Sequence, residues 1–202
     1  MPYYERIISS GPMREVEVYY SIRRRDLKCL TREKKRAQSS EKQKALNEIR
    51  AKKKCQRLIC NNFTVGDWYL TLTFTENLTE EEADRMLNNF LRRLDYWCGK
   101  NGIDDLKYMG CLEKGSKGKR WHAHMVVPYL QAEIIQQIWK KGKDTGSIKF
   151  EQLYSDGNYK KLAAYIRKDI TGKKRLKQSR NLKQPQIEVK EAGVRDVARF
   201  LK

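Results

Sequence analysis

The stretch from residue 68 to residue 127 limits the fold most, because its hydrophobic pattern changes from a strand to a helix and back to strands. Trp68 to Phe74 (WYLTLTF) is rich in β-branched and aromatic residues and predicts a core strand. Leu106 to Glu113 (LKYMGCLE) and Trp121 to Val127 (WHAHMVV) predict two more strands, joined by a hairpin loop with two glycines. This order favours an antiparallel sheet that carries a helix.

The helix in this stretch has both a start signal and a buried side. Thr79 followed by three glutamates has the form of a capping box, with acidic residues in the first turn where they favour the helix dipole. Apolar residues then recur at steps of three and four, and Asn101-Gly102 ends the pattern. They are Ala83, Met86, Leu87, Phe90, Leu91, Leu94 and Trp97.

The remaining elements alternate in the same way. A β-rich opening strand is predicted for Glu15 to Ile22, and a mostly exposed basic helix for about Arg32 to Asn61. A short helix (Ala132 to Trp139), a strand (Gly146 to Leu153) and a last helix (Asn158 to Asp169) follow, and the residues after 172 read as basic and irregular. We expect one compact α+β domain with a single core and a mainly antiparallel sheet.

The net charge of +19 exceeds what solubility requires and points to a polyanionic partner. Residues 23 to 57 contain 15 Lys and Arg against 4 Asp and Glu, and residues 167 to 183 contain 8 against 1. A solvated helix face and a flexible basic tail would give the same pattern, so charge alone leaves nucleic-acid binding open. A membrane surface fits less well, because neither segment has bulky aromatic residues on an apolar face.

The five cysteines stand at irregular spacings without a CxxC pair, which favours reduced thiols. Cys55 and Cys60 could form half of a zinc site, but no other Cys pair or spare His completes it. No stretch reaches the roughly 18 to 20 apolar residues of a membrane span, and the N-terminus lacks a secretion signal pattern. We therefore expect a cytoplasmic protein with no membrane partner.

His122 and His124 are the only histidines in the chain, and they stand two apart in a predicted strand. Their imidazoles should therefore project from the same face of the sheet, with Glu113 across the hairpin as a third ligand. A His2Glu set with open positions suits a divalent ion that must still bind a substrate. Histidines that only pack are the alternative, but two polar rings on a mostly buried strand need partners.

Tyr165 and Lys168 lie three residues apart on the last predicted helix, so their side chains should share one face. With a free pKa near 10, only about one tyrosine in a thousand is ionised at neutral pH, so a nucleophilic tyrosine needs a nearby cation or base. Lys168 or a metal ion could serve. Most helical tyrosines only pack, so this pair carries little weight by itself.

Together these motifs resemble the HUH endonuclease superfamily and, within it, the small rolling-circle replication initiators of bacterial plasmids and phages. LTLTF (Leu70 to Phe74) is similar to their first motif, WHAHMVV to the His-hydrophobe-His motif, and YIRK (Tyr165 to Lys168) to the tyrosine motif. The resemblance covers roughly two-thirds of the chain. Two positions depart from the pattern: Ala123 is a small central residue, and Asp169 stands where relatives often have a second aromatic residue.

The resemblance implies a five-stranded antiparallel sheet with a ferredoxin-like, RRM-like core, a central HxH strand and the tyrosine helix packed nearby. It also implies a sequence-specific single-strand DNA endonuclease that nicks and rejoins. Mg²⁺ or Mn²⁺ would be held by Glu113, His122 and His124, Tyr165 would attack the phosphate, and Lys168 would stabilise the charge. With a single tyrosine, the strand-closing step is undefined, and Tyr159 is expected to point away from Tyr165.

We divide the chain into an N-terminal strand and basic helix (1 to 60), a nicking-joining core (61 to 172) and a basic C-terminal segment (173 to 202). Single-stranded or hairpin origin DNA is the expected partner, and a host or accessory helicase must unwind it, because no phosphate-binding loop motif is present. A non-enzymatic single-strand binder, or a transposition or conjugation relative, remains open. The expected DNA-binding residues are Lys52, Lys53, Lys54, Lys117, Lys119, Arg120, Arg167, Lys173, Lys174, Arg175 and Arg180.

Overall fold

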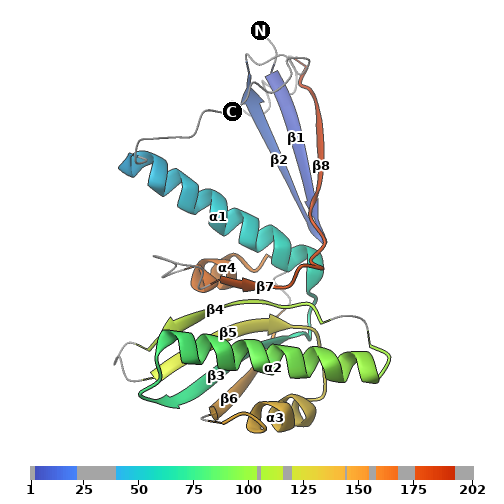
Figure 1. The fold of residues 1–202 in the computed structure, drawn as a ribbon. Coiled ribbons are helices and arrows are strands. Elements are labelled where there is room, and N and C mark those ends of the chain that lie inside the picture. Colours follow the sequence, from blue (N-terminus) through green and yellow to red (C-terminus); the bar gives the residue numbers. More distant parts are fainter. Residues whose placement is uncertain are drawn as a thin grey trace.

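Two antiparallel sheets and four helices make up the part of the chain that the computed structural model describes, which is residues 3–21, 40–103, 106–115, 120–143, 145–154, 158–167 and 176–193. The larger sheet has the order β6-β3-β5-β4-β7 and the smaller one the order β2-β1-β8 (Figure 1). The α+β prediction with a five-stranded antiparallel sheet is confirmed, and the HxH strand is its central strand. The five strands are β3 (Trp68–Glu76), β4 (Met109–Lys114), β5 (Arg120–Val127), β6 (Thr145–Gln152) and β7 (Leu176–Gln178).

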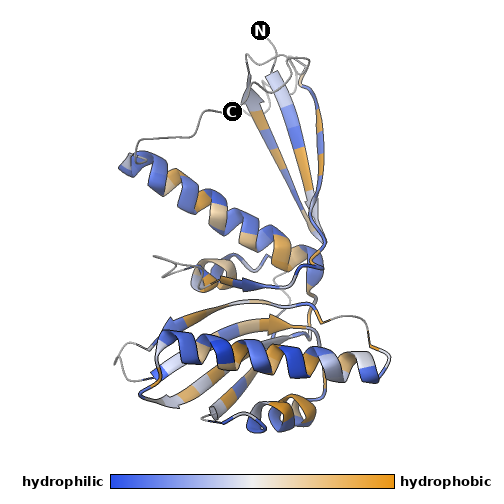
Figure 2. Ribbon diagram, viewed as in Figure 1, coloured by the Kyte–Doolittle hydropathy of each residue, from blue (hydrophilic) through white to orange (hydrophobic). Residues whose placement is uncertain are grey.

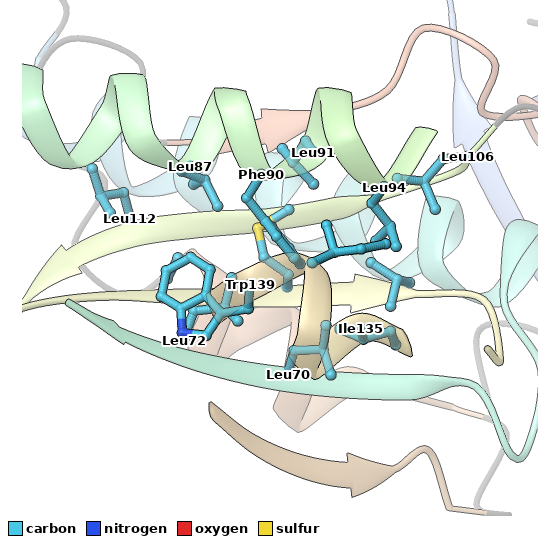
Figure 3. Close-up of a cluster of buried hydrophobic side chains, with 14 of the residues drawn as sticks. Leu70, Leu72, Leu87, Phe90, Leu91, Leu94, Leu106, Leu112, Ile135 and Trp139 are labelled. Atoms are coloured by element: carbon cyan, nitrogen blue, oxygen red, sulfur yellow. The ribbon is translucent and has the colours of Figure 1, made fainter. Parts of the chain in front are cut away.

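One face of this sheet carries helices α2 (Glu80–Lys100) and α3 (Ala132–Lys140). The capping box forms as predicted: the Thr79 hydroxyl accepts from the Glu82 backbone N–H at 3.2 Å, and the Glu82 carboxylate accepts from the Thr79 N–H at 2.8 Å. Leu70 and Leu72 of β3 meet the apolar stripe of α2 and Trp139 of α3 in a fully buried cluster (Figure 3). This cluster fixes the sheet from one side.

The opposite face is covered only in part, by α1 (Glu41–Asn62) and α4 (Lys160–Ile166). Only the last turns of α1 have buried residues, and these are Cys55, Leu58, Ile59 and Cys60. The earlier turns are mostly hydrophilic (Figure 2), and they project away from the large sheet (Figure 1). The expected single core is thus corrected to two hydrophobic clusters, one on either face of the sheet.

The small sheet joins both ends of the chain, since β1 (Tyr3–Ser10) pairs with β2 (Met13–Tyr20) and with β8 (Gln186–Glu191). Gly11 closes the β1–β2 hairpin with a φ of +55°, and its N–H donates to the Asn61 side chain at 3.1 Å. A side chain at Gly11 would collide with the Cys60 carbonyl of α1, so the hairpin tip and this helix end meet backbone to backbone.

Several predicted elements need correction. The opening strand ends at Tyr20 and belongs to the small sheet, and residues beyond 172 are not all irregular, because they include β7 and β8. Strand β1 was not predicted at all. The last helix begins two residues later than predicted, since Tyr159 has a φ of +46° and precedes the first turn. Residues 32–39 of the predicted basic helix lie outside the described residues.

No helix in the described part of the chain is long and apolar enough to cross a membrane.

Candidate active site

Strand alternation gathers polar side chains on the half-covered face of the sheet. In β5, Ala123 and Met125 point into the α2 cluster, so His122 and His124 point to the other face. The register sets Glu113 of β4 opposite His122. On the other side of β5, Thr71 of β3 lies opposite His124, and Thr73 lies opposite His122.

Three side chains meet at one point on this face. His124 Nε2 lies 2.9 Å from Glu113 Oε1, and the Tyr165 hydroxyl donates to the same carboxylate oxygen at 3.1 Å. The hydroxyl is also 3.2 Å from His124 Nε2, and the two rings meet edge to face with their centroids 4.9 Å apart. A carboxylate, an imidazole and a phenol from three different elements are therefore in mutual contact.

The other side of each imidazole is held by hydroxyl groups of β3. His124 Nδ1 lies 2.9 Å from the Tyr69 hydroxyl and 3.3 Å from the Thr71 hydroxyl, and His122 Nδ1 lies 3.2 Å from Thr73 Oγ1. Hydroxyl groups both donate and accept, so they can support either neutral tautomer. His124 can thus carry its proton on Nε2 beside Glu113, or on Nδ1 with Nε2 open to another ligand.

Burial shifts the pKa values of His124 and Tyr69 in this cluster. His124 is 6% exposed, and burial lowers its pKa below the ordinary value, while the neighbouring Glu113 carboxylate works in the opposite direction. The imidazole is therefore neutral at neutral pH, as a metal ligand must be. Burial raises the pKa of Tyr69, with a further contribution from Tyr165, so Tyr69 stays a protonated hydrogen-bonding group.

The three predicted metal ligands lie on one face of the sheet, but their side chains do not converge on a single metal position. The His122 and His124 ring centroids lie 6.5 Å apart, and no three His, Cys, Asp or Glu side chains of the described residues form a ready metal cluster. The donor types nevertheless fit a divalent ion: two imidazoles and a carboxylate on adjacent strands. Both imidazoles also have the outer hydrogen bonds that orient metal-binding histidines.

Helix α4 presents Tyr165 to this cluster. Leu162, Ala163 and Ile166 are buried against α1, while Tyr165 is 37% exposed. Tyr159, the other tyrosine considered in the sequence, is only 2% exposed and packs in the core. Lys168 lies outside the described residues.

The predicted DNA-binding residues have different surroundings. Lys52 pairs with Glu48 at 2.6 Å, and Lys53 lies 3.5 Å from Glu17 of β2, so both have carboxylate partners. Lys54, Arg120 and Arg180 are exposed, and Arg167 is half-buried at the end of α4. Those that lie outside the described residues are Lys117, Lys119, Lys173, Lys174 and Arg175.

Sequence reasoning missed the three β3 residues that hold the imidazoles, Tyr69, Thr71 and Thr73. Their signal is the alternation in WYLTLTF, where every second residue is apolar and buried in the α2 cluster. The residues between them had to face the other side.

Comparison with protein families identifies the chain. The family model of the replication-associated protein ORF2/G2P matches residues 67–170, just over half of the chain. The chain belongs to the replication-associated protein ORF2/G2P family. The matched range holds the histidines, Glu113 and Tyr165. Comparisons with curated proteins and with solved structures found no match.

Proposed function

We propose that this protein is an HUH-type endonuclease that starts rolling-circle replication of a plasmid or phage by nicking and later rejoining one DNA strand. The observation that carries the proposal is the contact of the Tyr165 hydroxyl with Glu113 Oε1 at 3.1 Å and His124 Nε2 at 3.2 Å. A tyrosine that only packed would not need to bring its hydroxyl to an imidazole and a carboxylate. Membership in a replication-associated family supports the same reading.

The reaction is a transesterification. The Tyr165 oxygen attacks the scissile phosphorus, a phosphotyrosine bond to the 5′ side forms, and the bond to the 3′ oxygen breaks. The proton of the phenol passes first toward Glu113, whose carboxylate accepts its hydrogen bond, and finally replaces the lost bond on the 3′ oxygen. The 3′-OH primes synthesis, and the phosphotyrosine keeps the bond energy for rejoining.

Glu113, His122 and His124 would hold Mg²⁺ or Mn²⁺, which when bound supplies Lewis-acid polarisation of the phosphate. The chain's own contribution is orientation. Tyr69, Thr71 and Thr73 fix the two imidazole rings, and α4 fixes the phenol. Lys168 would stabilise the tyrosinate or the charge that develops on the phosphate.

The DNA would be single-stranded or folded as a hairpin, bound by its phosphates to exposed cations such as Lys54, Arg120 and Arg180, with a separate helicase for unwinding. Binding should weaken with salt at a log-log slope of about −0.7 per neutralised phosphate. A salt-insensitive affinity would remove the basic residues from the interface.

Trapping the covalent adduct tests the proposal. Wild-type protein, Tyr165→Phe and Tyr159→Phe are incubated with an oligonucleotide labelled 3′ of the nick and run on a denaturing gel. Tyr165→Phe keeps the ring and loses only the hydroxyl, so it should bind DNA but give no shifted protein band, while the other two proteins give one. Adduct formation by Tyr165→Phe would refute the tyrosine assignment.

Chelation tests the metal separately. EDTA should stop cleavage by the wild type, and Mg²⁺ or Mn²⁺ should restore it, with little change in DNA binding. Full activity in EDTA would remove the three ligands from the mechanism. Tight binding without any cleavage would leave the chain as a non-enzymatic single-strand binder.

A further inference from the structure

A cluster of positively charged side chains lies away from Tyr165, on the side of the sheet that α2 covers. A hollow of about 330 Å³ opens between α2 and the turn that leads from α3 to β6. Among the described residues that line it, four are basic and one is acidic. They are Arg85, Arg93, Lys141, Lys143 and Glu82.

The acidic residue is already engaged. Both the backbone N–H and the hydroxyl of Thr79 donate to the Glu82 carboxylate, at 2.8 and 2.9 Å. Glu82 keeps its negative charge and interacts with Arg85, but one carboxylate faces four cations, and the described part of the chain supplies no other acidic residue to the lining, so these residues carry an excess of positive charge.

Arg93 has an unsatisfied donor beside the hollow. Its Nε atom is buried and has no hydrogen-bond partner among the described residues, an arrangement that costs free energy until an acceptor reaches it. The lack of a side chain at Gly142 leaves room for the Arg93 guanidinium. A Cβ atom at this position would stand 3.2 Å from Arg93 Nη2 and 3.0 Å from Thr145 Cγ2. A planar guanidinium beside further cations suits a phosphate group best.

Strand β6 connects the hollow with the sheet face that carries His124. His124, Thr71 and Lys149 are register partners across β5, β3 and β6, so they form a row that crosses the polar face and ends at the edge strand β6. Lys149 is well exposed at that end. Thr145, at the start of the same strand, lines the hollow, about 13 Å along the strand from Lys149.

We propose that this hollow binds a backbone phosphate of the DNA strand where the strand leaves the polar face and turns around the β6 edge. The inference rests on the proposed function for the identity of the ligand. It adds a phosphate anchor that is remote from the reacting atoms. Arg93 supplies the guanidinium that lines the hollow beside Gly142, and Arg85, Lys141 and Lys143 supply the surrounding charge.

The test uses Arg93→Gln, with Lys100→Gln as the matched control because it removes the same charge from the last turn of the same helix. Affinity for a long single-stranded oligonucleotide is measured by fluorescence anisotropy over a range of salt. Arg93→Gln should lower the log-log salt slope by about 0.7, the value for one lost phosphate contact. Gly142→Ala keeps every charge and should also weaken binding by displacing the guanidinium, whereas the control should match the wild type.

A direct readout is the NMR signal of the Arg93 Nε–H, followed during titration with inorganic phosphate, a short oligothymidylate or a long one. The signal should shift at the lowest concentration with the long oligonucleotide. Equal response to inorganic phosphate would assign the hollow to free anions and overturn the DNA proposal, as would no response at all.

A failure of the proposed nicking function and a failure of the phosphate anchor give different experimental results. At saturating DNA, the wild type and the control Lys100→Gln should form the covalent adduct equally fast, so adduct formation reports the nicking reaction separately from the anchor. If no protein forms an adduct while the Arg93 signal still responds to the long oligonucleotide, the nicking proposal fails and the phosphate anchor stands. If adducts form and the signal is silent, the anchor fails alone.

Discussion

The two faces of the five-stranded sheet are built from alternate residues of the same strands, yet they have opposite character. On the α2 face, Leu70, Leu72 and Ala123 are fully buried among apolar side chains. On the other face, their neighbours Thr71 and His124 take part in a hydrogen-bonded cluster with Tyr165. Helices α1 and α4 cover that second face only in part.

The two faces of the sheet have different roles. The apolar face supplies the free energy that holds the sheet together, while the polar face can hold side chains that packing alone would not select. Substitutions one residue apart should therefore have different kinds of effect, stability on one face and reaction on the other.

The largest effect is expected for His124→Ala. Loss of several kcal/mol of transition-state stabilisation corresponds to a fall in cleavage rate of at least about 1,000-fold. DNA affinity should stay nearly unchanged, because phosphate contacts are spread over many Lys and Arg side chains. Single-turnover cleavage measures the first and anisotropy the second. His122→Ala should behave alike, and cleavage at the wild-type rate in either variant would show that these imidazoles take no part in the reaction.

On the apolar face, Leu72→Ala should cost about 2 to 5 kcal/mol of unfolding free energy, since the side chain is fully buried and leaves a cavity. Denaturant unfolding followed by circular dichroism gives the value. The neighbouring Thr71→Val should change stability much less. Equal losses from the two substitutions would mean that both faces serve packing.

A smaller effect is expected for Tyr69→Phe, which removes the 2.9 Å contact to His124 Nδ1 and keeps the ring. Outer hydrogen bonds of this kind typically contribute about 10- to 100-fold in metal affinity or activity. The Mn²⁺ concentration that supports half-maximal cleavage should therefore rise. Tyr154→Phe, at an exposed tyrosine, serves as the control. An unchanged metal requirement in Tyr69→Phe would limit this residue to packing.

The smallest effect concerns pH. Because burial lowers the pKa of His124, the unfolded chain binds its proton first as the pH falls below about 6.5, and the folded chain only at lower pH. The unfolding free energy should therefore decrease across that window, by at most about 1.4 kcal/mol per pH unit from this one group. Denaturant unfolding at several pH values should show a shallower decrease for His124→Gln. Identical slopes would contradict the assigned burial effect.

Much of the large sheet could be predicted from sequence because its signals are local. The capping box at Thr79 and the alternation in β3 and β5 each follow from short-range patterns. Strand β7 has only three residues, and β1 and β8 pair across nearly the whole chain, so their pairing has no short-range signal. A single core was expected because periodicity shows that a face is buried but not which partner buries it.

For the candidate site, the sequence indicated which residue types to consider but not their distances. That Tyr165 meets Glu113 and His124 depends on how α4 packs against α1, which is a long-range contact. The pairing of Lys53 with Glu15 and Glu17 likewise depends on the position of the small sheet. A charge count could not separate such lysines from those that remain available to DNA.

Mapping the covalent bond shows directly whether Tyr165 is the residue that joins to DNA. Wild-type protein is reacted with an origin oligonucleotide, the DNA is trimmed with nuclease, and the protein is digested and analysed by mass spectrometry. We expect a nucleotide on the peptide that contains Tyr165 and on no other peptide. A nucleotide on any of the other tyrosines, or cleaved DNA with no modified peptide, would contradict it.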